Sequence, residues 1–164
     1  MKKSKKRRKG FDGIPGMKNM RCPYCGRHVL LRSADGIYKE NMQNARLYVC
    51  SAYPECDSYV RVHPGTAIPV GSLANGKLRA LRRAAHRHFD KLHECGLMSK
   101  SDAYNWLAHT LQSPQSQAHI GYLSEYCCNL VISECGKYLD TWSHKIENSS
   151  HMAQAGGGAA YAAQ

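Results

Sequence analysis

The chain has 164 residues, a formal net charge of +11 and eight cysteines. This length allows one domain of ordinary size, or a small metal-stabilised module beside a helical one. No apolar run reaches the roughly 18 residues that a membrane-spanning helix needs, so the composition excludes such a helix and we expect a soluble protein.

The positive charge is concentrated in the first part of the chain. Residues 1–9 contain seven basic and no acidic residues, residues 10–94 have a net charge of +6, and residues 95–164 have a net charge of −2. A positive field of this kind is typical of a protein that binds a polyanion, and nucleic acid is the polyanion that we expect.

Residues 1–20 are predicted to form a disordered basic arm and linker, because a block of like charges repels itself. We expect the arm to contact phosphates in a salt-sensitive manner, although a solubility tail or a nuclear import signal has the same composition. The side chains concerned are Lys2, Lys3, Lys5, Lys6, Arg7, Arg8 and Lys9.

Two close pairs of cysteines predict a zinc ribbon over residues 21–66. Cys22 and Cys25 lie in CPYCG, and Cys50 and Cys56 follow after 24 intervening residues. Each pair can give two thiolates to a tetrahedral Zn²⁺, and four thiolates leave no position for substrate, so we predict one structural zinc ion. The alternatives are two disulfides or four uncoordinated thiols. Because the N-terminus has no secretory segment, we expect a reducing cytoplasm, which disfavours disulfides.

Segments rich in branched and aromatic residues predict the strands of the ribbon, at residues 28–32, 47–50 and 59–63. The predicted fold class is α+β, with a small antiparallel zinc ribbon followed by a compact three-helix unit over residues 67–140.

The three helices are predicted from periodicity and from capping residues. The first covers residues 77–93, with Gly96 as its C-terminal capping residue. Its apolar stripe consists of Leu78, Leu81, Ala85, Phe89 and Leu92. The second is capped by Ser99 or Ser101 and the third by Ser124. Residues 141–164 are predicted to be a weakly ordered to disordered tail, because the apolar pattern weakens after Gly136 and small polar residues dominate the end.

Basic and aromatic side chains beyond the arm are candidates for nucleic-acid contact. Arginine forms bidentate contacts with phosphate, and tyrosine stacks on unpaired bases. The candidates are Arg27, Arg32, Tyr53 and Arg61 in the ribbon and Lys77, Arg79, Arg82, Arg83 and Arg87 in the first helix. The competing interpretation is a solvated helix face, with some ribbon tyrosines in the core.

Two further sets of polar residues could carry chemistry. His63, His86, Asp90 and His119 could form a metal-dependent nuclease site or a hydrogen-bonded structural network. A second zinc site could combine His88, His93 and Cys95 with Cys127 or Cys128, although this spacing matches no zinc finger. No acidic cluster for magnesium and no nucleophile with its base occurs, so the sequence favours a protein that is not an enzyme.

The pairing of CPYCG with CSAYPEC resembles the C-terminal zinc fingers of bacterial type IA DNA topoisomerases. This resemblance implies that the four cysteines are the ligands and that the ribbon contacts single-stranded DNA. The insert between the two pairs is longer here, and no topoisomerase catalytic domain is present.

A second resemblance covers roughly residues 20–138. The succession of the ribbon, Pro69-Val-Gly71, Leu78-Arg79, Trp106-Leu107 and His119-Ile-Gly121 is similar to a bacterial and phage family of zinc-finger-containing domains without an established activity. It implies the extent of the domain and a prokaryotic or viral cytoplasm.

The leading hypothesis is a non-catalytic accessory protein that binds nucleic acid, with DNA, and single-stranded DNA above all, as the expected ligand. The alternative is a protein-interaction module that docks on a host nucleic-acid enzyme, since a positive field also attracts acidic protein surfaces. A metal-dependent nuclease is the third hypothesis. Nothing in the sequence indicates a small-molecule substrate.

Overall fold

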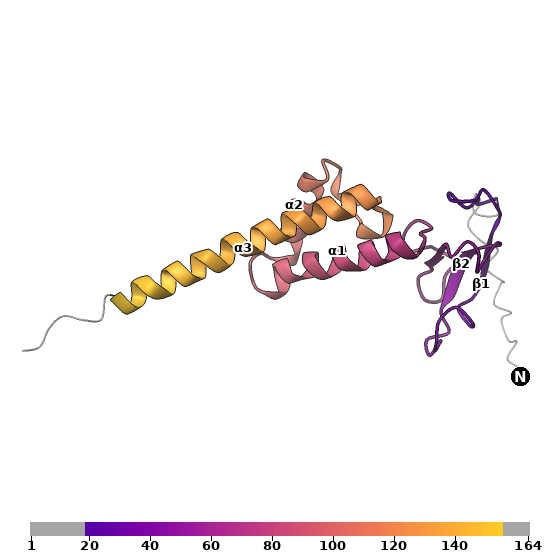
Figure 1. Ribbon diagram of the computed structural model, residues 1–164, viewed down its shortest axis with the longest axis horizontal. Helices are drawn as coiled ribbons and strands as arrows, with labels where there is room; N and C mark the ends of the chain where they lie inside the picture. The colour runs from indigo at the N-terminus through magenta and orange to yellow at the C-terminus, as the bar shows by residue number, and fades with distance from the viewer. Residues whose placement is uncertain (1–18, 156–164) are drawn as a thin grey trace, which may run out of the picture. The chain divides into compact units, whose positions relative to one another are not determined.

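The computed structural model describes residues 19–155, and for residues 145–155 it describes the backbone alone. The described chain forms three strands and then three α-helices (Figure 1): β1 Val29–Ser33, β2 Arg46–Cys50, β3 Tyr59–Arg61, α1 Gly76–Glu94, α2 Lys100–Thr110 and α3 Glu125–Ala155. Two short 3₁₀ helices, η1 Gln115–Gln117 and η2 Ile120–Tyr122, connect α2 to α3. This order confirms the predicted α+β class. None of the helices described is long and apolar enough to span a membrane.

The chain divides into two compact units between Arg79 and Ala80, so the boundary falls in the first turns of α1. We call the part up to Arg79 unit 1 and the part from Ala80 unit 2. The sequence placed the end of the ribbon at residue 66, but residues beyond it pair with the sheet. Tyr59 and Ala74 exchange backbone hydrogen bonds of 3.0 and 3.3 Å, and Val62 forms a bridge with Pro69.

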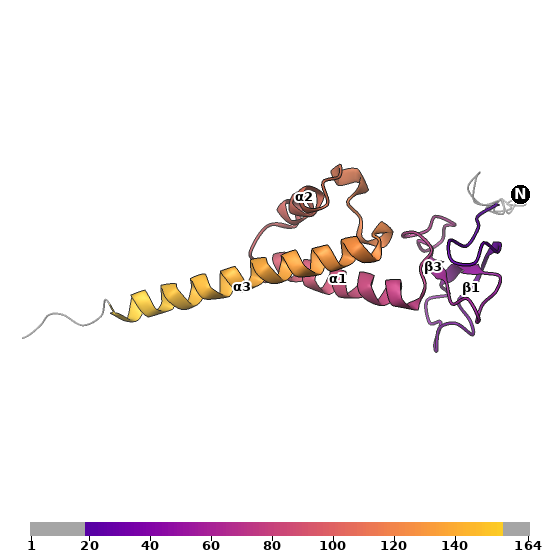
Figure 2. The same ribbon diagram turned by 45° about the horizontal axis from the view of Figure 1, so that its top comes forward.

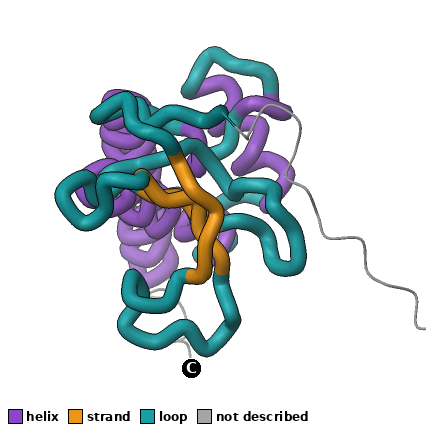
Figure 3. Tube along the Cα trace, turned by 90° about the vertical axis from the view of Figure 1, so that its right-hand side faces the viewer, coloured by secondary structure: helices purple, strands orange, loops and turns teal. Residues whose placement is uncertain are grey.

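The sheet of unit 1 is antiparallel with the strand order β1-β2-β3, and Figure 3 shows its short strands and the long loops around them. Residues that lie opposite one another in this register share a face of the sheet. One face, which we call the tyrosine face, carries Leu30, Arg32, Leu47, Val49, Tyr59 and Arg61. The other, the cysteine face, carries Val29, Leu31, Tyr48, Cys50 and Val60.

Each face of the sheet covers a small hydrophobic cluster. The cluster on the cysteine face includes Cys22, Val29, Tyr48, Cys50 and Leu73, all at most 7% exposed. The Tyr48 hydroxyl donates to the Ala67 carbonyl at 3.0 Å, so this tyrosine belongs to the core. The cluster on the tyrosine face consists of buried Ala34, Ala45, Leu47 and Val49, with Ile37, Tyr38, Tyr53 and Tyr59 packed against it.

The caps predicted at Gly96, at Ser99 or Ser101 and at Ser124 are confirmed, with Ser99 as the cap of α2, and the structure adds an N-terminal cap of α1 at Asn75. The backbone nitrogen of Leu78 donates to Asn75 Oδ1 at 2.9 Å at the start of α1, and Gly96 ends this helix with a φ of +72°. Ser99 caps α2 through the Asp102 nitrogen, and Ser124 caps α3 through the Cys127 nitrogen.

Unit 2 is held together by apolar contacts among its helices. Figures 1 and 2 both show α1 beside the first half of α3. The ring centroids of Phe89 in α1 and Tyr104 in α2 lie 5.2 Å apart, and those of Trp106 in α2 and Tyr138 in α3 lie 6.4 Å apart. Eleven buried side chains fill this core: Ala85, Phe89, Leu92, Ala103, Leu107, Ala118, Ile120, Leu123, Cys128, Val131 and Cys135.

Helix α3 continues to Ala155, past Gly136 and past residue 141, where the predicted weakly ordered tail begins. The physical reason is that no proline and no second glycine interrupts residues 137–155, so each further residue adds one backbone hydrogen bond. A single glycine costs an α-helix only about 1 kcal/mol. The remaining residues of that tail, 156–164, lie outside the described residues.

Arg82 occupies the apolar stripe of α1. The buried positions of this helix are Leu78, Arg82, Ala85, Phe89 and Leu92, whereas Leu81, which was predicted to belong to the stripe, is partly exposed. Arg82 is 9% exposed, and its Nε and Nη2 donate to the Leu123 carbonyl at 3.0 and 2.8 Å. The guanidinium therefore links α1 to the segment that precedes α3.

We predict that Arg82→Ala destabilises unit 2 by about 2 kcal/mol, because it leaves a buried carbonyl without a charged donor. Chemical denaturation followed by far-ultraviolet circular dichroism measures the change. Arg83→Ala is the matched control, since the neighbouring side chain is exposed and should alter stability by less than about 0.5 kcal/mol. Equal stability of the two variants would contradict the structural role of Arg82.

Candidate metal centre and basic surface

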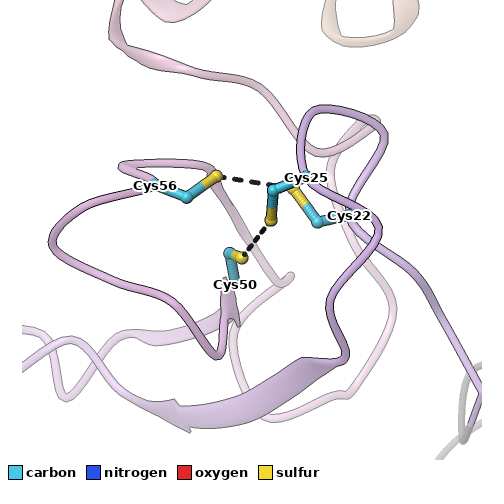
Figure 4. A group of neighbouring side chains, drawn as sticks. All are labelled: Cys22, Cys25, Cys50 and Cys56. Carbon is cyan, nitrogen blue, oxygen red and sulfur yellow. Dashed lines mark hydrogen bonds between the residues drawn. The ribbon is translucent and has the colours of Figure 1, made fainter.

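The four predicted cysteine ligands lie together at one end of unit 1. Their sulfurs are all within 4.8 Å of one another, and Figure 4 shows the side chains pointing toward a common centre. The sulfurs of Cys25 and Cys50 are 3.3 Å apart, and those of Cys22 and Cys56 are 3.6 Å apart. Cys22 and Cys50 are buried, whereas Cys25 is exposed.

Tight turns place the two cysteines of each pair side by side. In the first turn, the Gly26 nitrogen donates to the Cys22 carbonyl at 2.9 Å, and Gly26 has a φ of +72°, which a residue with a β-carbon rarely adopts. In the second turn, the Cys56 nitrogen donates to the Ala52 carbonyl at 3.0 Å. Cys50 is also the last residue of β2, so the sheet itself positions one ligand.

The arrangement fits a tetrahedral zinc ion. A Zn–S bond of about 2.3 Å in a regular tetrahedron places the sulfurs about 3.8 Å apart, close to the separations found here. Four thiolates and no carboxylate form the donor set, which favours zinc over magnesium or calcium. The Ala52 nitrogen donates to Cys50 Sγ at 3.4 Å, the kind of outer contact that orients a metal ligand. The four cysteines would hold one structural zinc ion.

Two of the thiols have shifted pKa values. Burial raises the pKa of Cys50 to about 12, because the charged thiolate is poorly solvated there. The hydrogen bond with the Ser58 hydroxyl lowers the pKa of Cys56 to about 7, because it favours the thiolate. Zinc must therefore displace a proton from Cys50 at neutral pH, whereas Cys56 is already partly ionised.

Among the described residues, the four cysteines of unit 1 are the one group placed to hold a metal ion. His88, His93, Cys95, Cys127 and Cys128 form no such group. His63 belongs to unit 1, and His86 and His119 belong to unit 2. Asp90 lies 3.6 Å from His93, its neighbour in α1.

The structure separates the predicted nucleic-acid contacts into exposed and structural side chains. Arg27, Arg32, Lys77, Arg83 and Arg87 are exposed, and Tyr53 and Arg61 are partly buried. Arg82 is in the core of unit 2, as described above. The basic residues from Lys2 to Lys9 lie outside the described residues.

Arg79 is also engaged within the fold. Its Nη1 donates to the carbonyls of Asp57 and Ala74, both at 2.6 Å, and its Nη2 forms a salt bridge with the Asp57 carboxylate at 3.1 Å. Its guanidinium lies 3.6 Å from the centroid of the Tyr59 ring. Because these contacts occupy the guanidinium, we leave Arg79 and Arg82 out of any nucleic-acid interface.

Asp57 is a structural residue that the sequence did not reveal. Its carboxylate accepts hydrogen bonds from the Gly76 nitrogen at 2.8 Å and from Arg79, so it binds the first turn of α1. A β-carbon at position 76 would lie 2.6 Å from this carboxylate, which explains the glycine there. The partners of Asp57 follow it by 19 and 22 residues, so no local pattern indicates the contact.

The ribbon tyrosines have different environments. Tyr48 is in the core, whereas Tyr24 is 45% exposed beside the first cysteine turn. Tyr53 and Tyr59 are partly exposed on the tyrosine face, and the Arg32 guanidinium lies 5.7 Å from the centroid of Tyr53. The tyrosine face thus combines arginines with rings that are accessible in part.

The chain matches a known protein family. A family model described as a zinc-finger-containing domain matches residues 18–138, which span both units. This match agrees with the four-cysteine cluster, and together they identify a zinc-binding module. No curated protein and no solved structure matches.

We predict that Cys22→Ser abolishes stoichiometric zinc binding and unfolds unit 1, because three thiolates cannot close the site and the small core cannot compensate. Metal analysis of the purified protein should give one zinc ion per chain for the wild type and for Cys95→Ser, which changes an exposed cysteine outside the cluster. Two zinc ions per wild-type chain would contradict the single-site assignment.

We also predict that zinc affinity falls as the pH falls. Because zinc binding displaces the Cys50 proton, the zinc affinity should fall at least tenfold for each unit by which the pH falls. Below about pH 7, near the pKa of Cys56, the affinity should fall more steeply. Competition with a chromophoric chelator of known pH dependence measures this slope. An affinity that is constant across neutral pH would contradict the prediction.

Proposed function

The chain belongs to this family of zinc-finger-containing domains, and from that premise we propose that it is a non-catalytic accessory protein whose zinc ribbon binds nucleic acid. The metal folds the ribbon, and side chains on the sheet contact the ligand. The preferred ligand is single-stranded DNA. The place of action that we propose is the cytoplasm of a bacterial or phage-infected cell.

The observation that carries this proposal is the composition of the tyrosine face. Arg32 and Arg61 flank Leu47 in one row across the three strands, so both arginines project from the same side of the sheet. The strand spacing puts the two Cα atoms roughly 10 Å apart. Leu47 itself is buried in the cluster, so the exposed Arg32 and the partly exposed Arg61 are the groups of this row that can contact phosphates of a DNA single strand.

Apolar and aromatic groups lie beside these arginines. Tyr53 is partly exposed under Arg32, and Leu30, two residues before Arg32 on the same face, is 55% exposed. Unpaired bases stack on tyrosine rings and on guanidinium planes, whereas a duplex keeps its base faces covered. The face therefore favours a single strand, and the resemblance of CPYCG and CSAYPEC to topoisomerase fingers favours DNA over RNA.

A metal-dependent nuclease receives no support. The described part of the chain has no second cluster of metal-binding side chains. We therefore do not propose a catalytic role.

A second candidate function is docking on a host nucleic-acid enzyme through unit 2. A groove of about 230 Å³ is lined by Leu97, Tyr138, Thr141 and Trp142, and the two aromatic side chains are 43% and 38% exposed. Exposed aromatic side chains around an apolar groove are typical of protein interfaces. In this alternative, Trp142→Ala should abolish retention of one stoichiometric partner from nuclease-treated lysate while leaving oligonucleotide binding unchanged.

We predict that affinity for single-stranded DNA falls steeply as salt concentration rises, because phosphate contacts release counterions. Deletion of residues 1–9 should flatten the dependence of log K on log salt. Arg32→Ala should weaken binding about tenfold and reduce the slope by roughly one. Fluorescence anisotropy with single-stranded DNA, duplex DNA and RNA of equal length measures these changes.

Lys100→Ala is the matched control, since this exposed basic residue belongs to unit 2 whereas the tyrosine face belongs to unit 1, and its loss should leave affinity unchanged. Affinity that does not respond to salt would overturn the proposal. Equal loss of affinity in the Arg32 and Lys100 variants would show a non-specific charge effect and would remove the tyrosine face from the interface.

A further inference from the structure

Unit 1 contains a pocket of about 150 Å³ next to the tyrosine face. Residues 43–46, which end at the first residue of β2, form one wall, and residues 61–66, which begin at the last residue of β3, form the other. Neither the zinc site nor the contacts discussed so far involve its polar lining, apart from Arg61.

The wall that leads into β2 is held by Asn41. The Ala45 nitrogen donates to Asn41 Oδ1 at 2.7 Å, and Asn41 Nδ2 donates to Asp35 Oδ1 at 3.0 Å. Asn44 adopts a φ of +48°, which turns the chain sharply between these anchors. This wall is therefore ordered before any ligand arrives.

The opposite wall is a turn stabilised by Thr66. The Thr66 nitrogen donates to the His63 carbonyl at 3.0 Å, and the Ile68 nitrogen donates to Thr66 Oγ1 at 3.0 Å. Gly65 has a φ of +71°, so this position requires glycine. These bonds use the backbone of His63 and leave its side chain exposed.

One side-chain hydrogen bond joins the two walls. Arg61 Nη2 donates to Gln43 Oε1 at 2.7 Å, and Ala45 and Val62, 8% and 3% exposed, supply apolar lining between the walls. Binding to a pre-ordered pocket loses little conformational entropy, which favours a specific ligand over a transient contact.

The charge and the size of the pocket restrict the ligand. Its lining contains Arg46, Arg61 and His63, and no acidic residue is among the described residues that line it, so a metal cation is disfavoured. A volume of about 150 Å³ in a protein can hold one benzene ring. An anion that carries a single planar ring meets both conditions.

We infer that this pocket binds one unpaired nucleotide of a single strand, with the base between Gln43 and His63 and the phosphate against Arg61. The glutamine amide can hydrogen-bond the edge of the base, and the imidazole can stack on its face. This inference deepens the proposed function and depends on it. It adds a pocket that holds one base individually, beside the rings and arginines of the tyrosine face.

The test is a titration of the isotope-labelled full chain, followed by nuclear magnetic resonance, with an oligothymidylate of about eight nucleotides. We expect the side-chain resonances of Gln43 and His63 to shift together with those of Arg32 and Tyr53. His63→Ala should weaken oligonucleotide binding about tenfold, the loss expected for one stacked base, whereas His119→Ala, an exposed histidine of unit 2, should have no effect.

The possible outcomes distinguish failure of the pocket inference from failure of the proposed function. If Arg32 and Tyr53 respond and Gln43 and His63 do not, the pocket inference is overturned and nucleic-acid binding stands. If no resonance responds, both fail. Inorganic phosphate and thymidine monophosphate are titrated separately as control ligands. If inorganic phosphate alone reproduces the full set of shifts, the pocket is a simple anion site and the nucleotide assignment is overturned.

Discussion

The coordination of one zinc ion by four thiolates is the constraint on which unit 1 depends. Its strands have five, five and three residues, and each face of the sheet covers only a small cluster. A ribbon of this size buries too little apolar surface to offset its conformational entropy. Structural zinc sites contribute about 10–16 kcal/mol of binding free energy at neutral pH, which is available only when the chain folds around the ion.

The metal site is also connected to the start of the first helix. Cys56 is a ligand, and the next residue, Asp57, binds the Gly76 nitrogen and the Arg79 guanidinium. Arg79 in turn covers the ring of Tyr59 on β3. The first turn of α1 is thus part of unit 1, and a basic residue of that turn stabilises the fold instead of remaining available to a ligand.

With a closed metal site, a ligand must be bound by protein side chains and not by the metal. Because the four thiolates leave no coordination position for a substrate or for water, zinc can act only by holding the scaffold. The scaffold then presents Arg32 and Tyr53 on one sheet face and Gln43 and His63 in the adjoining pocket. The proposed interface depends on the rigidity of the sheet and of the pocket walls, because a rigid scaffold holds the arginines and the aromatic rings at fixed separations.

The sequence by itself determined the zinc ligands in two tight pairs, the α+β order of elements, and the helix caps at Ser124 and Gly96, whereas it left the cap of α2 open between Ser99 and Ser101. It also contained an unused signal for Arg82, which lies four residues after Leu78 and three before Ala85, on the buried stripe. Its partner, the Leu123 carbonyl, is 41 residues away and could not be predicted.

Only the tertiary structure decided which basic residues are structural and which are exposed. Arg79, Arg82 and Arg83 lie close together in one basic helix, yet the first stacks on Tyr59, the second binds Leu123 and the third is exposed. Contacts with segments distant in sequence decide which of these arginines are structural. Two segments distant in sequence, residues 43–46 and 61–66, also form the pocket. The composition of a helix gives its charge, but burial against remote segments determines where each charge is used.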